Sequence, residues 1–133
     1  MSGRRIPWLA LAIAISGTAV HAHHSLAAYD SSRQVTIQAV VTQFQFVNPH
    51  PVLVVEGKDT SGKVQEWRLE LDNRWELTAV GITAETFKPG DRLVVSGNRG
   101  RAQSPPSMYV QKLVRPGDGF GFEQINSSPR LLR

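Results

Sequence analysis

From residue 35 onward, hydrophobic and polar residues alternate with the period of two that is typical of β-strands. The clearest run is 35–46, "VTIQAVVTQFQF", in which alternate residues up to Val41 place their hydrophobic side chains on one face. After Val41 the hydrophobic positions change phase, to Phe44 and Phe46. A change of phase inside a strand indicates a bulge or a bend. The pattern therefore predicts a long first strand with an irregularity after Val41.

Four further segments show strand patterns, and turn-forming residues separate them. Gly62 and the pair Pro89–Gly90 are strong turn signals. The additional predicted strands are 52–59, 64–71, 92–98 and 108–115. The chain is therefore expected to contain five strands.

The segment 72–82, "DNRWELTAVGI", changes period and predicts a short helix between the third and fourth strands. Asp72 or Asn73 can cap its start, and Gly81 is placed to end it. Five strands with a helix in this position follow the order of an OB-like fold, a five-stranded, partly open Greek-key barrel. The pattern therefore predicts an all-β protein with one short helix that forms a five-stranded OB-like Greek-key barrel. Another small β-sandwich or a meander is the alternative.

Two tryptophans have predicted places in this fold. Trp67 alternates with Leu69 and Leu71, so we expect its side chain in the hydrophobic core. Trp75 lies in the predicted helix and is expected to close one end of the barrel. Both side chains are thus expected to be buried.

The first 22 residues have the features of a secretory signal. Arg4 and Arg5 precede the apolar run 8–16, and Val20-His21-Ala22 fits a signal-peptidase site. The apolar run is shorter than the roughly 20 residues that a membrane-spanning helix needs. Cleavage after Ala22 is therefore favoured over a membrane anchor. We expect a periplasmic protein that has no membrane span after cleavage.

These boundaries divide the chain into four parts. The last part contains Gly117, Gly119 and Gly121, and we expect it to be a flexible tail. The parts are the signal peptide 1–22, a histidine-bearing N-terminal segment 23–34, the OB-like barrel 35–116 and the tail 117–133.

The amino-acid composition excludes several kinds of binding site and bears on the class of partner. The chain has no cysteine, so disulfides, thiolate metal sites and a lipid anchor on cysteine are excluded. The full chain carries a formal charge of +4. Without Arg4 and Arg5, 13 basic residues remain against 11 acidic ones, a net charge of +2. This small excess, together with export, gives no reason to expect a nucleic-acid partner.

Several motifs together resemble a known family. They are "HHS" directly after the predicted cleavage site, "NPH", the Trp67–Glu70 stretch and "KPGD". In this order they are similar to a family of small exported bacterial proteins that is classed as a domain of unknown function. The resemblance covers about 23–118, although the closing "RPGDG" departs in detail. It implies a periplasmic location and an OB-like fold, and it implies no activity.

Three histidines suggest a transition-metal site. Cleavage after Ala22 would make His23 the first residue, with its amine and its imidazole as two neighbouring nitrogen ligands, and His24 would add a second imidazole. His50 lies in the stiff loop "NPHP" and is the candidate ligand from the folded body. Nitrogen ligands favour Cu(II), with Ni(II) and Zn(II) behind it. The ligand types are those of a histidine brace, in which a terminal amine and two imidazoles hold one copper.

Three neighbours of the loop are expected to support this site. Glu70 is a candidate outer-shell acceptor if the third strand runs beside "NPHP". Asn48 and Phe46 lie at the start of the loop and could contribute to the same surface. Simpler interpretations stay open: His23 and His24 as a solvated tail, His50 as a turn residue bonded to backbone, and Glu70 on the solvent face of its strand.

Catalytic patterns are weak, so we expect no enzyme. Ser25 beside His24 has no orienting acid, and Glu66 with Glu70 lacks other marks of a glycosidase pair. The alternative function is a non-enzymatic OB-type binding module for an envelope glycan or an envelope protein partner. In that case Phe44, Phe46 and Tyr109 are the candidate stacking residues. A purely structural envelope protein is a third possibility.

Overall fold

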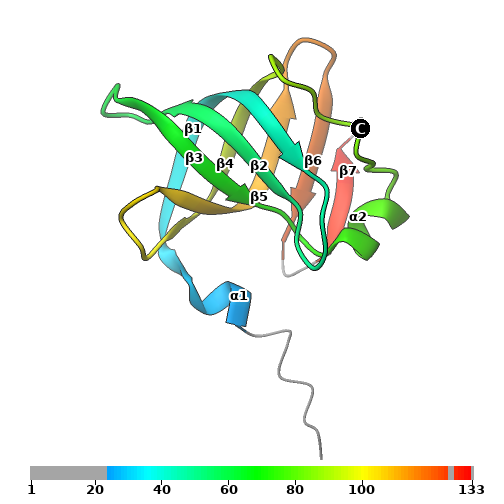
Figure 1. The fold of residues 1–133 in the computed structure, drawn as a ribbon, viewed down its shortest axis with the longest axis horizontal. Coiled ribbons are helices and arrows are strands. Elements are labelled where there is room, and N and C mark those ends of the chain that lie inside the picture. The colour runs from blue at the N-terminus through cyan, green and yellow to red at the C-terminus, as the bar shows by residue number, and fades with distance from the viewer. Residues whose placement is uncertain (1–23, 126–127, 133) are drawn as a thin grey trace, which may run out of the picture.

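The computed structural model describes residues 24–125 and 128–132. This part of the chain is an all-β fold with one short helix, α2 (Arg74–Ala79), and a single helical turn, α1 (His24–Ala27), before the first strand (Figure 1). Neither helix is long and apolar enough to cross a membrane. The strands are β1 (Tyr29–Gln45), β2 (Val52–Lys58), β3 (Val64–Glu70), β4 (Arg92–Gly100), β5 (Ser107–Arg115), β6 (Phe120–Gln124) and β7 (Pro129–Leu132).

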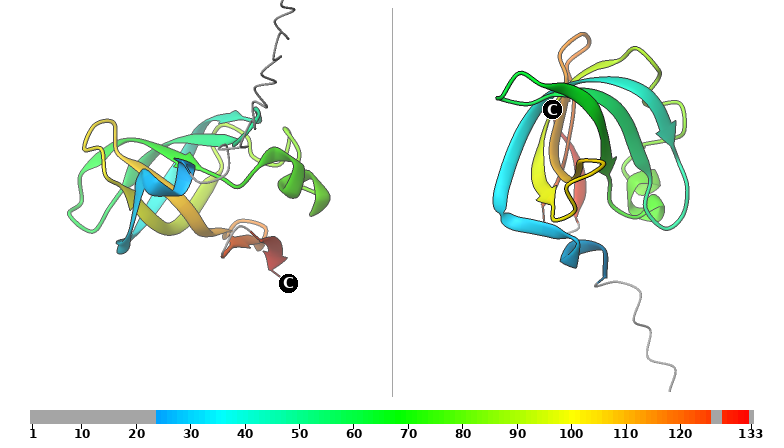
Figure 2. Two further views of the ribbon diagram at one scale, coloured as in Figure 1. Left: turned by 90° about the horizontal axis from the view of Figure 1, so that it is seen from below. Right: turned by 60° about the vertical axis from the view of Figure 1, so that its left-hand side comes forward.

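The strands form one sheet in the order β3-β2-β1-β4-β5-β6-β7, and each neighbouring pair is antiparallel. In addition, β3 pairs with β5 in parallel, where Leu69 lies opposite Met108 and Glu70 opposite Tyr109. This extra pairing requires the sheet to curl, and Figure 2 shows the strands curving around the core. The seam between β3 and β5 brings the end of β3 next to the start of β5.

The core forms where the buried faces of the curled sheet meet. Trp67 and Leu69 of β3 are fully buried, whereas Glu66 on the other face of the strand is exposed. The prediction that Trp67 belongs to the core is therefore confirmed. Ile37 and Val41 of β1 are buried in the same cluster, as the period-two pattern predicts.

The irregularity predicted in the first strand is present. The register of β1 against β2 shifts between Val41 and Gln43, as a β-bulge requires. The strand also starts earlier than expected, at Tyr29, and its register against β4 shifts again between Asp30 and Gln34. The predicted break is confirmed, and β1 reaches far into the segment that was expected to precede the barrel.

The helix has the predicted ends, but Trp75 does not have its predicted place. Asn73 is the N-cap, and its side chain accepts a hydrogen bond from Glu76 N at 2.9 Å. Gly81 follows the helix with φ of 92°. Trp75 is 82% exposed, so the expectation that it closes a barrel end is wrong. Leu77 faces the core instead, because residues two apart on a helix point to different sides.

The C-terminal region corrects the predicted number of strands from five to seven. Residues expected in a flexible tail form β6 and β7. β6 pairs with β5 and places Phe122 in the core with no exposed surface. Phe120 and Phe122 alternate as in a short strand, but the three glycines around them are also typical of a flexible tail.

Candidate functional site

The loop 48–51 is held firmly against the chain that enters α2. Arg74 N donates to Pro49 O at 3.0 Å, and Leu71 N donates to Pro51 O at 2.9 Å. These two backbone hydrogen bonds lie on either side of His50 in the loop. The position of His50 is therefore fixed by the fold.

His50 uses one ring nitrogen to bind the protein. Its Nδ1 lies 2.9 Å from Leu71 O, so Nδ1 carries a proton and donates to this carbonyl. The same nitrogen lies 3.6 Å from Glu70 Oε1, and the His50 side chain is 24% exposed. A bond of this kind fits a turn histidine, and it also orients histidines that bind metals through Nε2. The neutral ring then has Nε2 as its available lone pair.

Glu70 has a specific partner that the sequence did not indicate. Its side chain is only 20% exposed, and Oε2 accepts a hydrogen bond of 2.5 Å from the hydroxyl of Tyr29. Burial raises the pKa of Tyr29, and the hydrogen bond and negative charge of Glu70 raise it further. Tyr29 therefore stays a neutral donor, and Glu70 links the start of β1 to His50.

The segment before β1 is tied to the fold beside this contact. Arg101 N donates to Ala28 O at 2.9 Å, and Arg101 Nε donates to Ala27 O at 3.2 Å. Figure 1 shows α1 and the loop between β1 and β2 at the same, lower end of the sheet. His23 and the side chain of His24 lie outside the described part of the structure. The backbone of His24 belongs to α1, a few residues from Tyr29.

Two more carboxyl groups lie close to His50. Asp72 is buried, Glu76 is half-buried, and neither Asp72 Oδ2 nor Glu76 Oε2 has a hydrogen-bond donor among the described residues. Burial raises the pKa of Glu76, and so does the negative charge of Asp72, while His50 opposes this shift. The negative charge of Asp72 thus disfavours ionisation of Glu76. With Glu70, the two carboxyl groups make the surroundings of His50 acidic.

The remaining predicted site residues have different roles. Phe46 is half-buried against the core, and the guanidinium of Arg74 lies 4.9 Å from its ring centre. Asn48 is exposed at the start of the loop. Phe44 packs edge-on against Phe87 at 5.1 Å, and Tyr109 is 4% exposed. The three aromatic residues suggested for stacking on a sugar are thus engaged in packing.

The described side chains do not form a complete metal site. Within 24–125 and 128–132, no three histidine or acidic side chains are placed to hold a metal ion together. Of the three expected ligands, the structure places only the His50 side chain. Tyr29, Asp72 and Glu76 were not singled out from the sequence, because their proximity to His50 comes from the seam and from the loop contacts.

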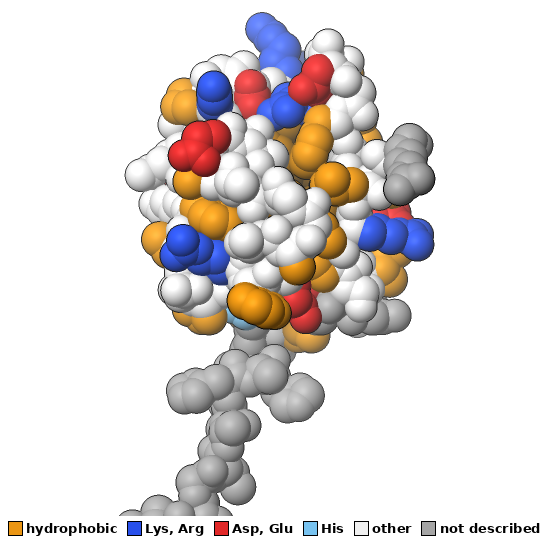
Figure 3. Space-filling view, turned by 90° about the vertical axis from the view of Figure 1, so that its right-hand side faces the viewer, with side chains coloured by type: hydrophobic (Ala, Val, Ile, Leu, Met, Phe, Trp, Pro, Cys, Tyr) orange, Lys and Arg blue, Asp and Glu red, His pale blue; other side chains and the backbone are white. Residues whose placement is uncertain are grey.

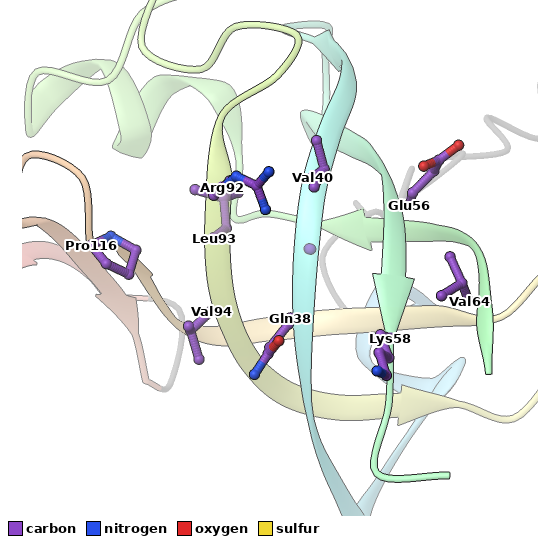
Figure 4. Close-up of a pocket in the computed structure, with 10 residues that line it drawn as sticks. Gln38, Val40, Glu56, Lys58, Val64, Arg92, Leu93, Val94 and Pro116 are labelled. Carbon is purple, nitrogen blue, oxygen red and sulfur yellow. The ribbon is translucent and has the colours of Figure 1, made fainter. Parts of the chain in front are cut away.

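A hollow on the outer face of β1, β2 and β4 is a second candidate site (Figure 4). Its volume is about 290 Å³. Val40 lies between Glu56 on β2 and Arg92 on β4, so opposite charges flank it. Lys58 also lines the hollow. The mixed charges do not indicate one class of ligand.

On the side of the molecule that carries α2 and β7, the exposed hydrophobic side chains are scattered. Trp75, Leu131 and Ile125 are exposed. Figure 3 shows hydrophobic side chains scattered among polar and charged ones on this side. Scattered exposed hydrophobic residues are normal on protein surfaces and do not define an interface.

Comparison with known proteins gives a family and no activity. No curated protein and no solved structure matches the chain. The sequence model of a family of unknown function, DUF6152, matches residues 11–107, which is most of the chain. The resemblance inferred from the histidine, "NPH" and "KPGD" motifs is thereby confirmed at the level of the family, and the chain belongs to the family of unknown function DUF6152.

Proposed function

We propose that the mature protein binds Cu(II) in the periplasm through the amine and ring of His23, the ring of His24 and Nε2 of His50. The observation that carries the proposal is the 2.9 Å contact between His50 Nδ1 and Leu71 O. This contact places the proton on Nδ1, which supports Nε2 as the proposed ligand atom. A backbone carbonyl in this position is a common outer-shell partner of metal-binding histidines.

The surroundings of His50 support a cation. Glu70 Oε1 lies 3.6 Å from Nδ1, and the Asp72–Glu76 pair adds negative charge nearby. Because carboxylates close to a ligand stabilise positive charge, they favour metal binding at the ring. Nitrogen ligands favour Cu(II) over Ni(II) and Zn(II).

The attachment of the N-terminal segment supports a shared site. Tyr29 bonds to Glu70, which in turn lies beside His50. Tyr29 is five residues after His24 in the sequence. The residues between them include the helical turn α1, so the proposal requires this turn to carry His23 and His24 to the loop.

The proposal also includes export with signal-peptide cleavage and an OB-like barrel. Cleavage after Ala22 would free the His23 amine, and the short apolar run before it supports a signal peptide. We also infer that β1 to β5 form the OB-like barrel. The pairings β1–β2, β2–β3, β3–β5, β5–β4 and β4–β1, which make a closed circuit, support this inference.

Calorimetric titration with Cu(II) tests the role of His50. The protein must begin at His23, and His50→Asn should keep a side-chain N–H near Leu71 O while removing Nε2. We expect His50→Asn and His50→Ala each to weaken binding at least about tenfold. Gln65→Asn, a change elsewhere on the sheet, is the control and should bind as the parent does.

A second titration tests the amine. One glycine added before His23 removes the amine from its position and should also weaken binding at least about tenfold. If His50→Asn binds Cu(II) as tightly as the parent while the added glycine abolishes binding, the site is a terminal peptide alone. The proposed participation of the fold would then be wrong.

A further inference from the structure

A separate cavity lies between the start of β1 and the strands β4, β5 and β6. Its volume is about 500 Å³, within the usual range for small-molecule sites. Leu26 of α1 and Ser31 of β1 lie along one side. Tyr29 and Tyr109, whose ring centres are 5.8 Å apart, form an aromatic part of the wall.

Two amide side chains of the residues that line the cavity each have one atom without a hydrogen-bond partner among the described residues. Gln124 has no exposed surface; its Oε1 accepts from Asp72 N at 2.7 Å, but its Nε2 has no acceptor among the described residues. Asn98 Oδ1 is also buried and accepts no hydrogen bond from the described part of the chain. Leaving such groups unsatisfied is costly, about 1–3 kcal/mol each. An unused donor and an unused acceptor therefore lie just behind one wall of the cavity, without accessible surface of their own.

The charged group in the wall already has partners. Arg101 lies 3.7 Å from Asp30 Oδ2 and donates to Ala27 O. The other polar lining residues are uncharged, because Tyr29 keeps its proton and Gln111 is an amide bonded to Gln34 at 3.0 Å. Apart from Arg101, which lies beside Asp30, the lining is thus uncharged, which favours a neutral polar ligand.

We propose that this cavity binds an uncharged saccharide unit, with Asn98 and Gln124 as its hydrogen-bonding residues and Tyr29 beside the sugar ring. A hydroxyl group both donates and accepts, so neighbouring hydroxyls can satisfy Gln124 Nε2 and Asn98 Oδ1 together. Both atoms are shielded from water in the structure, so binding requires each side chain to turn into the adjoining cavity, and for Gln124 this turn gives up the hydrogen bond from Asp72 N. The site does not depend on the copper proposal.

Nuclear magnetic resonance tests the cavity directly, because the side-chain amides of Asn98 and Gln124 give their own signals. The metal-free mature protein is titrated with maltotriose and tri-N-acetylchitotriose, and with trigalacturonate as a charged control. We expect one neutral trisaccharide to shift both amide signals, and trigalacturonate to leave them unchanged. The presence of a chelator throughout keeps this result separate from metal binding.

Two variants locate the binding. Asn98→Leu, which is close in size but cannot hydrogen-bond, should weaken the affinity about tenfold, which corresponds to about 1.4 kcal/mol. Gln38→Leu changes an amide of the hollow on the outer face of the sheet and should leave the affinity unchanged. The melting temperature of each variant shows whether it is folded. Gln111→Leu provides a second cavity variant should Asn98→Leu fail to fold.

Three outcomes would overturn the proposal. The first is that no neutral trisaccharide shifts the Asn98 and Gln124 amide signals at millimolar concentration. The second is that only trigalacturonate shifts them. The third is that Gln38→Leu weakens binding while the cavity variants do not, which would place the sugar on the outer face of the sheet.

Discussion

Trp67 and Trp75 have the same side chain in opposite environments, with exposed fractions of 0% and 82%. Trp67 is on the buried face of β3, where the guanidinium of Arg99 lies 5.1 Å from its ring centre. Trp75 is on α2, on a different side of the helix from the buried Leu77. At the scale of the residue, position on an element decides what the same side chain contributes.

The first prediction compares alanine substitutions of these two residues. Trp67→Ala should lower the free energy of unfolding by about 3–5 kcal/mol, because it leaves a large cavity in the core. Trp75→Ala is the matched control and should change it by no more than about 0.5 kcal/mol. Urea denaturation followed by circular dichroism measures both. Equal losses in the two variants would contradict the burial described above.

The second prediction concerns Tyr29 and pH. The pKa of Tyr29 is raised in the folded protein by burial and by Glu70. As pH rises, the unfolded chain therefore loses the Tyr29 proton before the folded protein does. The stabilisation that neutral Tyr29 gives the folded state is complete below about pH 10 and is lost as pH rises above that value. Tyr29→Phe removes the hydroxyl, and should cost about 1–2 kcal/mol at pH 7.

The measurement is the difference in unfolding free energy between parent and Tyr29→Phe, taken from pH 8 to pH 11. Groups other than Tyr29 titrate in both proteins and cancel in the difference. The difference should shrink as pH rises above about 10. A constant difference over this range would mean that the folded and unfolded states bind the Tyr29 proton equally.

At the scale of the element, the alternating pattern predicted the strands correctly where one face of the strand is buried. The bulge after Val41 and the helix cap are local features: the sequence predicted the bulge and limited the cap to Asp72 or Asn73, of which the structure has Asn73. The contact between Tyr29 and Glu70 joins two strands that are not hydrogen-bonded neighbours in the sheet order. No local pattern encodes such a contact, because it depends on how the sheet curls.

The C-terminal strands give the third prediction. A chain that ends at Asp118 lacks β6 and β7 and loses the fully buried Phe122. It should lose at least about 3 kcal/mol of unfolding free energy, as expected when a buried phenylalanine is removed. A chain that ends at Ile125 lacks only β7, where Leu131 is 43% exposed, and should lose much less.

Urea denaturation of the two shortened chains and the full mature chain makes the comparison. The expected order of stability is the mature chain, then the chain ending at Ile125, then the chain ending at Asp118. If all three unfold at the same urea concentration, the segment after Asp118 contributes nothing to the fold. The expectation of a flexible tail would then be correct despite the β5–β6 pairing.

At the scale of the whole molecule, the question is whether the N-terminal segment and the folded body act as one unit. The sequence suggested the same three histidines that the proposal uses, but it could not show their distances. The structure adds the hydrogen bond between Tyr29 and Glu70, which holds the start of β1 near His50, and the orientation of the His50 ring. Both come from tertiary contacts between the start of β1, the end of β3 and the loop 48–51.

The last prediction uses the link between binding and folding. A ligand stabilises a protein only by the difference between its affinities for the folded and unfolded chains. If His50 completes the site, Cu(II) prefers the folded chain, and at 100 times the dissociation constant it adds up to about 2.7 kcal/mol. This corresponds to a rise in melting temperature of roughly 10–20 °C. If only His23 and His24 bind, the unfolded chain binds equally well and the melting temperature stays unchanged. Thermal denaturation of the mature protein and of His50→Asn, each with and without Cu(II), distinguishes the two cases, because only the parent should be stabilised when the fold takes part in the site.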